Sequence, residues 1–144
     1  MKKLVAFFTL LFCFGCSKEI NSDITSFNFG RDFGLGGYYH YQIRVEDDKV
    51  IFTKEAIGMT TENIEKEITK KDLKEIQKII NEQEIYKWNG FDKTDKNVLD
   101  GSGFTLSVNY SNGENIEAHG YMRYPKNFKE ASDVLLEYLE TLEK

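Results

Sequence analysis

The sequence predicts an α+β fold, in which about six mostly antiparallel strands form one sheet and two amphipathic helices pack on one of its faces. Segments 38–46, 49–55 and 104–110 alternate apolar and polar residues, as strands with one buried face do. Segments 69–82 and 127–144 instead repeat apolar residues at helical spacing. Helices that cover one face of a sheet bury both apolar surfaces at once. We therefore expect the other face of the sheet to be polar.

A hairpin is predicted for segments 38–46 and 49–55, after a short strand at 24–29 and a glycine-rich loop at 30–37. The turn Asp47-Asp48 has two residues. It matches apolar with apolar residues and charge with charge, in the pairs Val45 with Val50, Ile43 with Phe52, and Glu46 with Lys49.

An edge strand, a helix and a long loop are predicted next. The edge strand is 64–68, with isoleucines on one face and glutamates on the other. Thr69 and Asp72 resemble a capping box and so predict where the helix starts. Trp88 follows the helix, and we expect it to be a large apolar anchor. We interpret the polar segment 89–102 as a loop.

A second hairpin is predicted for segments 104–110 and 116–120. A two-residue turn at Asn112-Gly113 would mix the apolar face with the charged one. A three-residue loop with Gly113 in the left-handed conformation keeps the faces separate, because it pairs Val108 with Ile116 and Leu106 with Ala118.

The final helix begins after the single proline, Pro125. Asn127 is the predicted N-cap, and Glu130 follows three residues later. No repeat or second composition regime is present. The chain therefore divides into a signal segment at 1–15, a lipidated N-terminus and tether at 16–26, and a single α+β domain at 27–144.

The signal segment is predicted from the order of its residues. Lys2 and Lys3 precede an apolar run at 4–14, and Gly15 stands directly before Cys16. The run is shorter than the roughly 20 apolar residues that span a bilayer. Gly15-Cys16 resembles the lipobox of bacterial lipoproteins. The resemblance implies cleavage before Cys16, lipidation of Cys16, and anchorage to a membrane of the bacterial cell envelope, such as the periplasmic or surface face of the outer membrane.

Charge and cysteine usage narrow the classes of function. The formal net charge is −5, and loss of Lys2 and Lys3 with the signal segment makes it −7. An acidic chain is not built to bind nucleic acid by phosphate neutralisation. The two cysteines are Cys13, in the signal segment, and Cys16. We therefore expect no disulfide and no thiol chemistry in the domain.

The candidate site residues lie on the polar sheet face and in nearby loops. In strand 38–46, alternation turns Tyr39 and Tyr41 to the core. It leaves Tyr38 and His40 on the outer face. His119 lies in the densest polar and aromatic cluster. The residues predicted to bind a ligand are Tyr38, His40, Asp100, His119, Tyr121, Arg123 and Tyr124.

No catalytic, metal or cofactor site is assigned from the sequence. Oxygen-bearing side chains in 89–102 suit calcium, but their spacing misses the EF-hand pattern and fits ordinary turns. The hypothesis is a lipid-anchored, non-catalytic module that binds a protein or small-molecule ligand through the polar sheet face. The alternatives are a small hydrolase centred on His119 and an inhibitor or immunity-type protein whose acidic surface fills a basic partner site.

Overall fold

The computed structural model describes residues 18–58 and 61–144, and over these ranges it confirms the α+β class. The signal segment and Cys16 lie outside the described residues. The described strands number seven rather than six. They are β1 (Ile24–Asp32), β2 (Gly37–Glu46), β3 (Lys49–Gly58), β4 (Glu62–Ile68), β5 (Phe91–Thr94), β6 (Gly103–Tyr110) and β7 (Asn115–Tyr121). The α-helices are α1 (Lys70–Glu82) and α2 (Phe128–Thr141), and two short 3-10 helices are η1 (Gly34–Gly36) and η2 (Ile85–Trp88).

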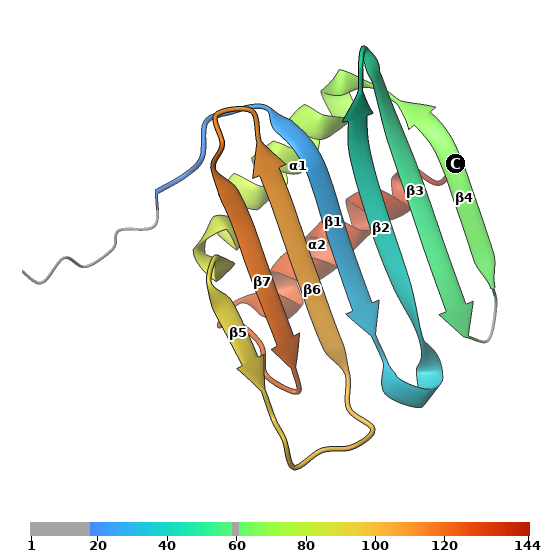
Figure 1. Ribbon diagram of the computed structural model, residues 1–144, viewed down its shortest axis with the longest axis vertical. Coiled ribbons are helices and arrows are strands. Elements are labelled where there is room, and N and C mark those ends of the chain that lie inside the picture. Colours follow the sequence, from blue (N-terminus) through green and yellow to red (C-terminus); the bar gives the residue numbers. More distant parts are fainter. Residues whose placement is uncertain (1–17, 59–60) are drawn as a thin grey trace, which may run out of the picture.

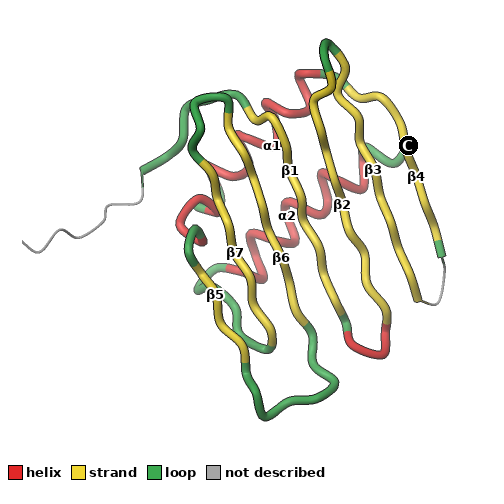
Figure 2. Tube along the Cα trace, viewed as in Figure 1, coloured by secondary structure: helices red, strands yellow, loops and turns green. Residues whose placement is uncertain are grey.

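All seven strands form one sheet in the order β4-β3-β2-β1-β6-β7-β5. Neighbouring strands are antiparallel except β5 and β7, which are parallel. Both α-helices lie on the same face of the sheet, as predicted, and the opposite face is uncovered (Figure 1 and Figure 2). None of the helices in the described part of the chain is long and apolar enough to cross a membrane.

Both predicted hairpin registers are confirmed. Residues 45 and 50 pair, as do 43 and 52, across the two-residue turn between β2 and β3. In the second hairpin Val108 pairs with Ile116. The amide of Tyr110 donates to the carbonyl of Glu114, which closes the three-residue loop, and Gly113 has φ +86°. The pairing of apolar faces therefore decided the turn type correctly.

Strand β5 was not predicted, because its sequence FDKT has neither alternation nor a β-branched run. It forms through backbone contacts with β7. Gly90 donates its amide to the carbonyl of Glu117, and the side chain of Asn89 accepts the Glu117 amide. At the other end the amide of Asp95 donates to the Tyr121 carbonyl. The interpretation of 89–102 as loop throughout is thus wrong for Phe91–Thr94.

Strand β1 is the central strand, and it extends further at its C-terminal end than the predicted strand 24–29. It starts at Ile24, inside the range 16–26 for which a tether was predicted, and it continues to Asp32 within the predicted loop. Ile20 and Ile24 are both buried, and the Ile20 carbonyl accepts a hydrogen bond from Gln77 of α1. The chain is therefore fixed to the domain from Ile20 onward.

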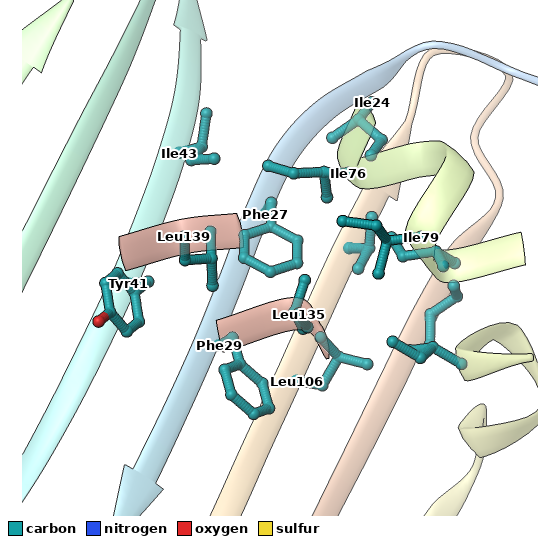
Figure 3. Packing of buried hydrophobic residues seen from close by; sticks show 14 of the residues in the cluster. Ile24, Phe27, Phe29, Tyr41, Ile43, Ile76, Ile79, Leu106, Leu135 and Leu139 are labelled. Atoms are coloured by element: carbon teal, nitrogen blue, oxygen red, sulfur yellow. The ribbon is translucent and has the colours of Figure 1, made fainter. Parts of the chain in front are cut away.

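The core lies between the sheet and the helices. Phe27 and Phe29 of β1 contact the apolar side of α2 around Leu135 and Leu139 (Figure 3). Each of these four side chains is completely or almost completely buried. Full burial of side chains of this size stabilises a fold by about 1.5–3 kcal/mol each, which explains how the domain holds without disulfides.

The predicted start of α1 is confirmed. The side chain of Thr69 accepts the amide of Asp72, and the carboxylate of Asp72 accepts the amide of Thr69, so both halves of a capping box are present. Tyr138 of α2 also donates its hydroxyl to Asp72, at 2.9 Å. Burial alone would raise the pKa of Asp72, but the hydrogen bonds from Thr69 and Tyr138 outweigh it and lower the pKa.

Asn127 is the N-cap residue of α2, as predicted, but its side chain has a different role from the expected one. Asn127 precedes the helix, but its side chain makes no capping hydrogen bond. Its Oδ1 accepts the indole N–H of Trp88 at 2.9 Å, and its Nδ2 donates to the Gln83 carbonyl at 2.6 Å. Asn127 thus joins α2 to the segment that follows α1.

We expect Asp72→Asn to lower the free energy of unfolding by about 1 kcal/mol at pH 7, as loss of a helix cap does. Because the folded-state pKa is lowered, the contribution of the carboxylate is present near neutral pH and is lost as pH falls through that value. The difference from wild type should therefore shrink at a pH below the ordinary aspartate pKa of about 3.9. Urea unfolding at both pH values measures it, with Glu82→Gln at the exposed end of α1 as control. An equal difference at both pH values would contradict the expectation.

Candidate functional site

The strand registers align the outward side chains of the uncovered face in rows across the sheet. One row runs over six strands, each residue directly opposite the next: Glu55, His40, Gly30, Thr105, His119 and Asp92. The neighbouring row is Ile57, Tyr38, Asp32, Gly103, Tyr121 and Thr94. In both rows the central positions on β1 and β6 carry small or short side chains.

A hollow of about 440 Å³ lies over these two rows. Four of the seven predicted binding residues line it: Tyr38, His40, His119 and Tyr121. They come from β2 and β7, with β1 and β6 between them. At about 4.8 Å per strand, β2 and β7 are about 14 Å apart. The sheet order thus places the two groups of aromatic and imidazole side chains on opposite sides of one hollow.

The floor of the hollow depends on Gly30. A Cβ at this position would lie 2.9 Å from Thr105 Oγ1 and 3.4 Å from His40 Cδ2. Any side chain on Gly30 would therefore fill the space between β2 and β6. Gly103 lies diagonally across from it and also lines the hollow.

The side chains that line the hollow include both donors and acceptors of hydrogen bonds, since Tyr38, His40 and Thr105 lie beside two carboxylates. Asp32 and Glu55 line it with their carboxylates, and the Gly34 amide occupies one oxygen of Asp32 at 2.8 Å. His119 Nδ1 lies 3.1 Å from Asp92 Oδ1. This contact orients the imidazole of His119, and its other nitrogen stays available to a ligand.

Tyr121 also supports the loop that follows β5. Its hydroxyl donates to the Leu99 carbonyl at 3.0 Å and accepts the Gly101 amide at 2.7 Å. The hydroxyl is therefore engaged in structure, and the ring is the part of Tyr121 that contributes to the hollow.

Three predicted site residues lie outside the hollow. Tyr124 packs on the covered side of the sheet, where its ring stacks with Phe104 and Phe128. Arg123 is exposed and pairs with Asp95 at 3.1 Å. Asp100 lies in the loop between β5 and β6, exposed to solvent. For Arg123 and Tyr124 the proximity to His119 in the sequence was misleading, because the chain turns to the helix side after Tyr121.

The covered side beneath the hollow is apolar and holds one arginine. The guanidinium of Arg31 lies over the rings of Phe33 and Phe128, with its carbon 5.3 and 4.9 Å from their centroids. Burial raises the pKa of Tyr39 to about 12, although Arg31 acts in the opposite direction. Tyr39 is therefore neutral at physiological pH, as suits a side chain packed against the core.

The acidic residues near β5 do not gather around a common point. Asp92 contacts His119, and Asp95 contacts Arg123 and Asn97. Within residues 18–58 and 61–144, no group of three or more histidine, cysteine, aspartate or glutamate side chains is arranged to hold a metal ion.

Several lining residues were missed by the sequence analysis, namely Gly30, Asp32, Glu55, Gly103 and Thr105. Alternation places Glu55 on the polar face, but which strands flank β1 was not evident from the sequence. No protein-family model matches this chain, and a search of curated proteins finds no similar sequence. The case for a site consequently rests on its geometry.

Proposed function

We propose that the chain is a lipid-anchored, non-catalytic binding module of the bacterial cell envelope, and that it holds a small ligand in the hollow of the uncovered sheet face. One observation carries the proposal. Tyr38 and His40 on β2, and His119 and Tyr121 on β7, line a single hollow although they lie about 80 residues apart in sequence. The volume, about 440 Å³, falls within the range of small-molecule sites.

The lining indicates the chemistry of the ligand. Tyr38 and Tyr121 provide aromatic surfaces against which a flat apolar face can pack. Asp32 and Glu55 accept hydrogen bonds but cannot donate them when ionised. The ligand that complements this lining has one flat apolar face and hydroxyl or amine donors along its edges.

The hydrolase alternative has a narrower basis. The contact between His119 and Asp92 would orient a general base. However, Asp92 is 84% exposed and His119 about half exposed, so the pair lies in water rather than in an enclosed site. The binding proposal is supported by four residues that line one hollow and by the space above Gly30, and for that reason we prefer it.

Filling the floor of the hollow tests the proposal. Labelled protein is titrated with monosaccharides, disaccharides, alkylamines and dipeptides, and amide chemical shifts are followed. We expect one of these classes to cause saturable shifts at Gly30 and Thr105. Gly30→Val should then weaken binding of the same compound at least about tenfold, because the added side chain occupies the space of the ligand.

The control places the same side chain elsewhere on the strand. Ser26→Val lies on the same face of β1, four residues from Gly30 and outside the hollow, and it should leave the affinity unchanged. Equal affinities of wild type and Gly30→Val, or no saturable shift with any compound, would contradict the proposal.

A further inference from the structure

Exposed hydrophobic side chains gather at one end of the sheet. Over residues 18–58 and 61–144, seven large hydrophobic side chains are exposed, and six of them lie where β1, β3 and β7 end and β2 and β6 begin. The seventh, Val134, lies on α2. Tyr38 belongs to the hollow, and the other five form what we call the apolar rim: Phe33, Leu35, Ile57, Leu99 and Met122. Leu35 and Leu99 project furthest, with 93% and 92% of their surface exposed.

The loops that carry the rim are packed together. Gly34 has φ +62°, and a Cβ on it would lie 3.0 Å from the Gly101 carbonyl oxygen and 3.3 Å from that of Asp100. The loop of Leu35 therefore contacts the loop of Leu99. The Ser102 amide donates to the sulfur of Met122 at 3.2 Å. Four of the five rim residues thus lie on three loops that are in contact, and Ile57 lies at the end of β3, beside the start of β2.

The rim lies at the opposite end of the sheet from the point where the chain enters the domain (Figure 1). Ile20 is fixed against α1 through Gln77, and β1 then runs from Ile24 to Asp32, eight steps or about 26 Å. Cys16 lies four residue steps before Ile20 in the sequence, and four steps of chain span at most about 14 Å. A bilayer that holds Cys16 thus lies next to the end of the domain remote from Leu35 and Leu99.

Acidic side chains border the rim. Asp32 precedes Phe33, and Asp100 follows Leu99. Among the described residues neither aspartate forms an ion pair, whereas Arg123, next to Met122, is paired with Asp95, and Lys96 lies three residues before Leu99. A surface that complements the rim is apolar in the middle and basic at its edges.

We propose that the apolar rim docks into an apolar groove, bordered by lysine or arginine, on a protein that lies away from the anchoring membrane. Leu35 and Leu99 insert into the groove, and Asp32 and Asp100 face its basic edges. The inference uses the proposed lipid anchor at Cys16 to exclude the adjacent bilayer as the occupant, and it does not depend on the hollow.

The test begins in cells that produce the full-length chain. A photo-crosslinking amino acid is placed at Met122, in the rim, and separately at Asn112, in the turn between β6 and β7 at the other end of the sheet. Position 122 should capture one protein that position 112 does not. That protein is then purified, and its affinity for the full-length chain in lipid nanodiscs is measured.

Matched variants decide the outcome. Leu35→Glu with Leu99→Glu should weaken binding at least about tenfold, since both leucines are central to the proposed contact. Higher salt should weaken it further, because the rim edges are charged. Val134→Glu introduces a glutamate at an exposed hydrophobic residue of α2, outside the rim, and should have no effect. All three positions are exposed, so each variant should keep the wild-type melting temperature.

Three results would overturn the proposal. One is capture of a second copy of this chain at position 122. Another is equal affinity of wild type and the double glutamate variant. The third is binding of an unanchored Cys16→Ser chain to phosphatidylethanolamine–phosphatidylglycerol vesicles that depends on Leu35 and Leu99. The lipid anchor is tested separately by labelling cells with palmitate. Wild type should be labelled and Cys16→Ser should not, and a wild-type chain without label would show that the proposed anchor is wrong.

Discussion

Trp88→Ala is expected to lower the free energy of unfolding by about 4 kcal/mol, the largest loss we expect from a single substitution. Trp88 is 1% exposed and packs against Phe104 and Phe128, with ring centroids 5.8 and 5.2 Å away. These three rings join η2, β6 and α2. Removing the indole leaves a cavity that the strands and helix cannot close, so the transfer and cavity terms add.

Trp88→Phe separates packing from hydrogen bonding. It keeps a ring in the core but removes the N–H that Asn127 Oδ1 accepts. The cost should be about 1–3 kcal/mol, from the unpaired amide oxygen and the smaller ring. Guanidinium unfolding of both variants measures the two contributions. If Trp88→Phe were as destabilising as Trp88→Ala, the hydrogen bond rather than the packing would dominate, contrary to our expectation.

Glu143→Ala is expected to cost about 2 kcal/mol, below the 3–5 kcal/mol of a fully buried pair. Lys54 lies on the helix-covered face of β3, and its Nζ is 2.6 Å from the Glu143 carboxylate. The two side chains are only 13% and 17% exposed. Tyr41 also donates its hydroxyl to Glu143, and burial together with this bond raises the pKa of Tyr41. Removing Glu143 leaves Lys54 and Tyr41 poorly solvated, with Glu62 as the remaining ion-pair partner of Lys54.

A double variant shows whether the cost comes from the charge left behind. Glu143→Leu combined with Lys54→Met should recover most of the stability, because a partly buried pair is replaceable by apolar groups. Asp133→Ala removes an exposed pair with Lys129 on α2 and should cost less than about 1 kcal/mol. Urea unfolding at neutral pH compares the three variants. A double variant no more stable than Glu143→Ala would contradict this explanation.

Local patterns predicted most elements of the fold. Alternation in strands β2, β3, β6 and β7 fixed which face of each is buried, and the turn lengths then followed from pairing apolar residues with each other. Thr69 and Asp72 marked the start of α1 correctly. Strand β5 was missed because its four residues form a strand only by pairing with β7. The paired residues of β7 are more than 20 positions away in the sequence.

The candidate site was only half predictable. The residue types of Tyr38, His40, His119 and Tyr121 and their place on the polar face could be read from alternation. The importance of Gly30 could not, because Gly30 falls in the predicted loop 30–37, and its place in β1 and its neighbours are known only once the strand order is known. The same holds for Asp92, whose contact with His119 arises from the parallel pairing of β5 with β7.

By itself the sequence determined the fold class, the buried face of most strands, the two hairpin registers and the start of both helices, since these depend on residues close together in the chain. The sequence also predicts lipidation at Cys16, and this residue lies outside the described residues. Only the tertiary structure decided that β1 lies between β2 and β6. That order depends on how the two hairpins share the central strand, and it brings β2 and β7 to opposite sides of the hollow over Gly30. It also brings the loops of Leu35 and Leu99 into contact at one end of the sheet.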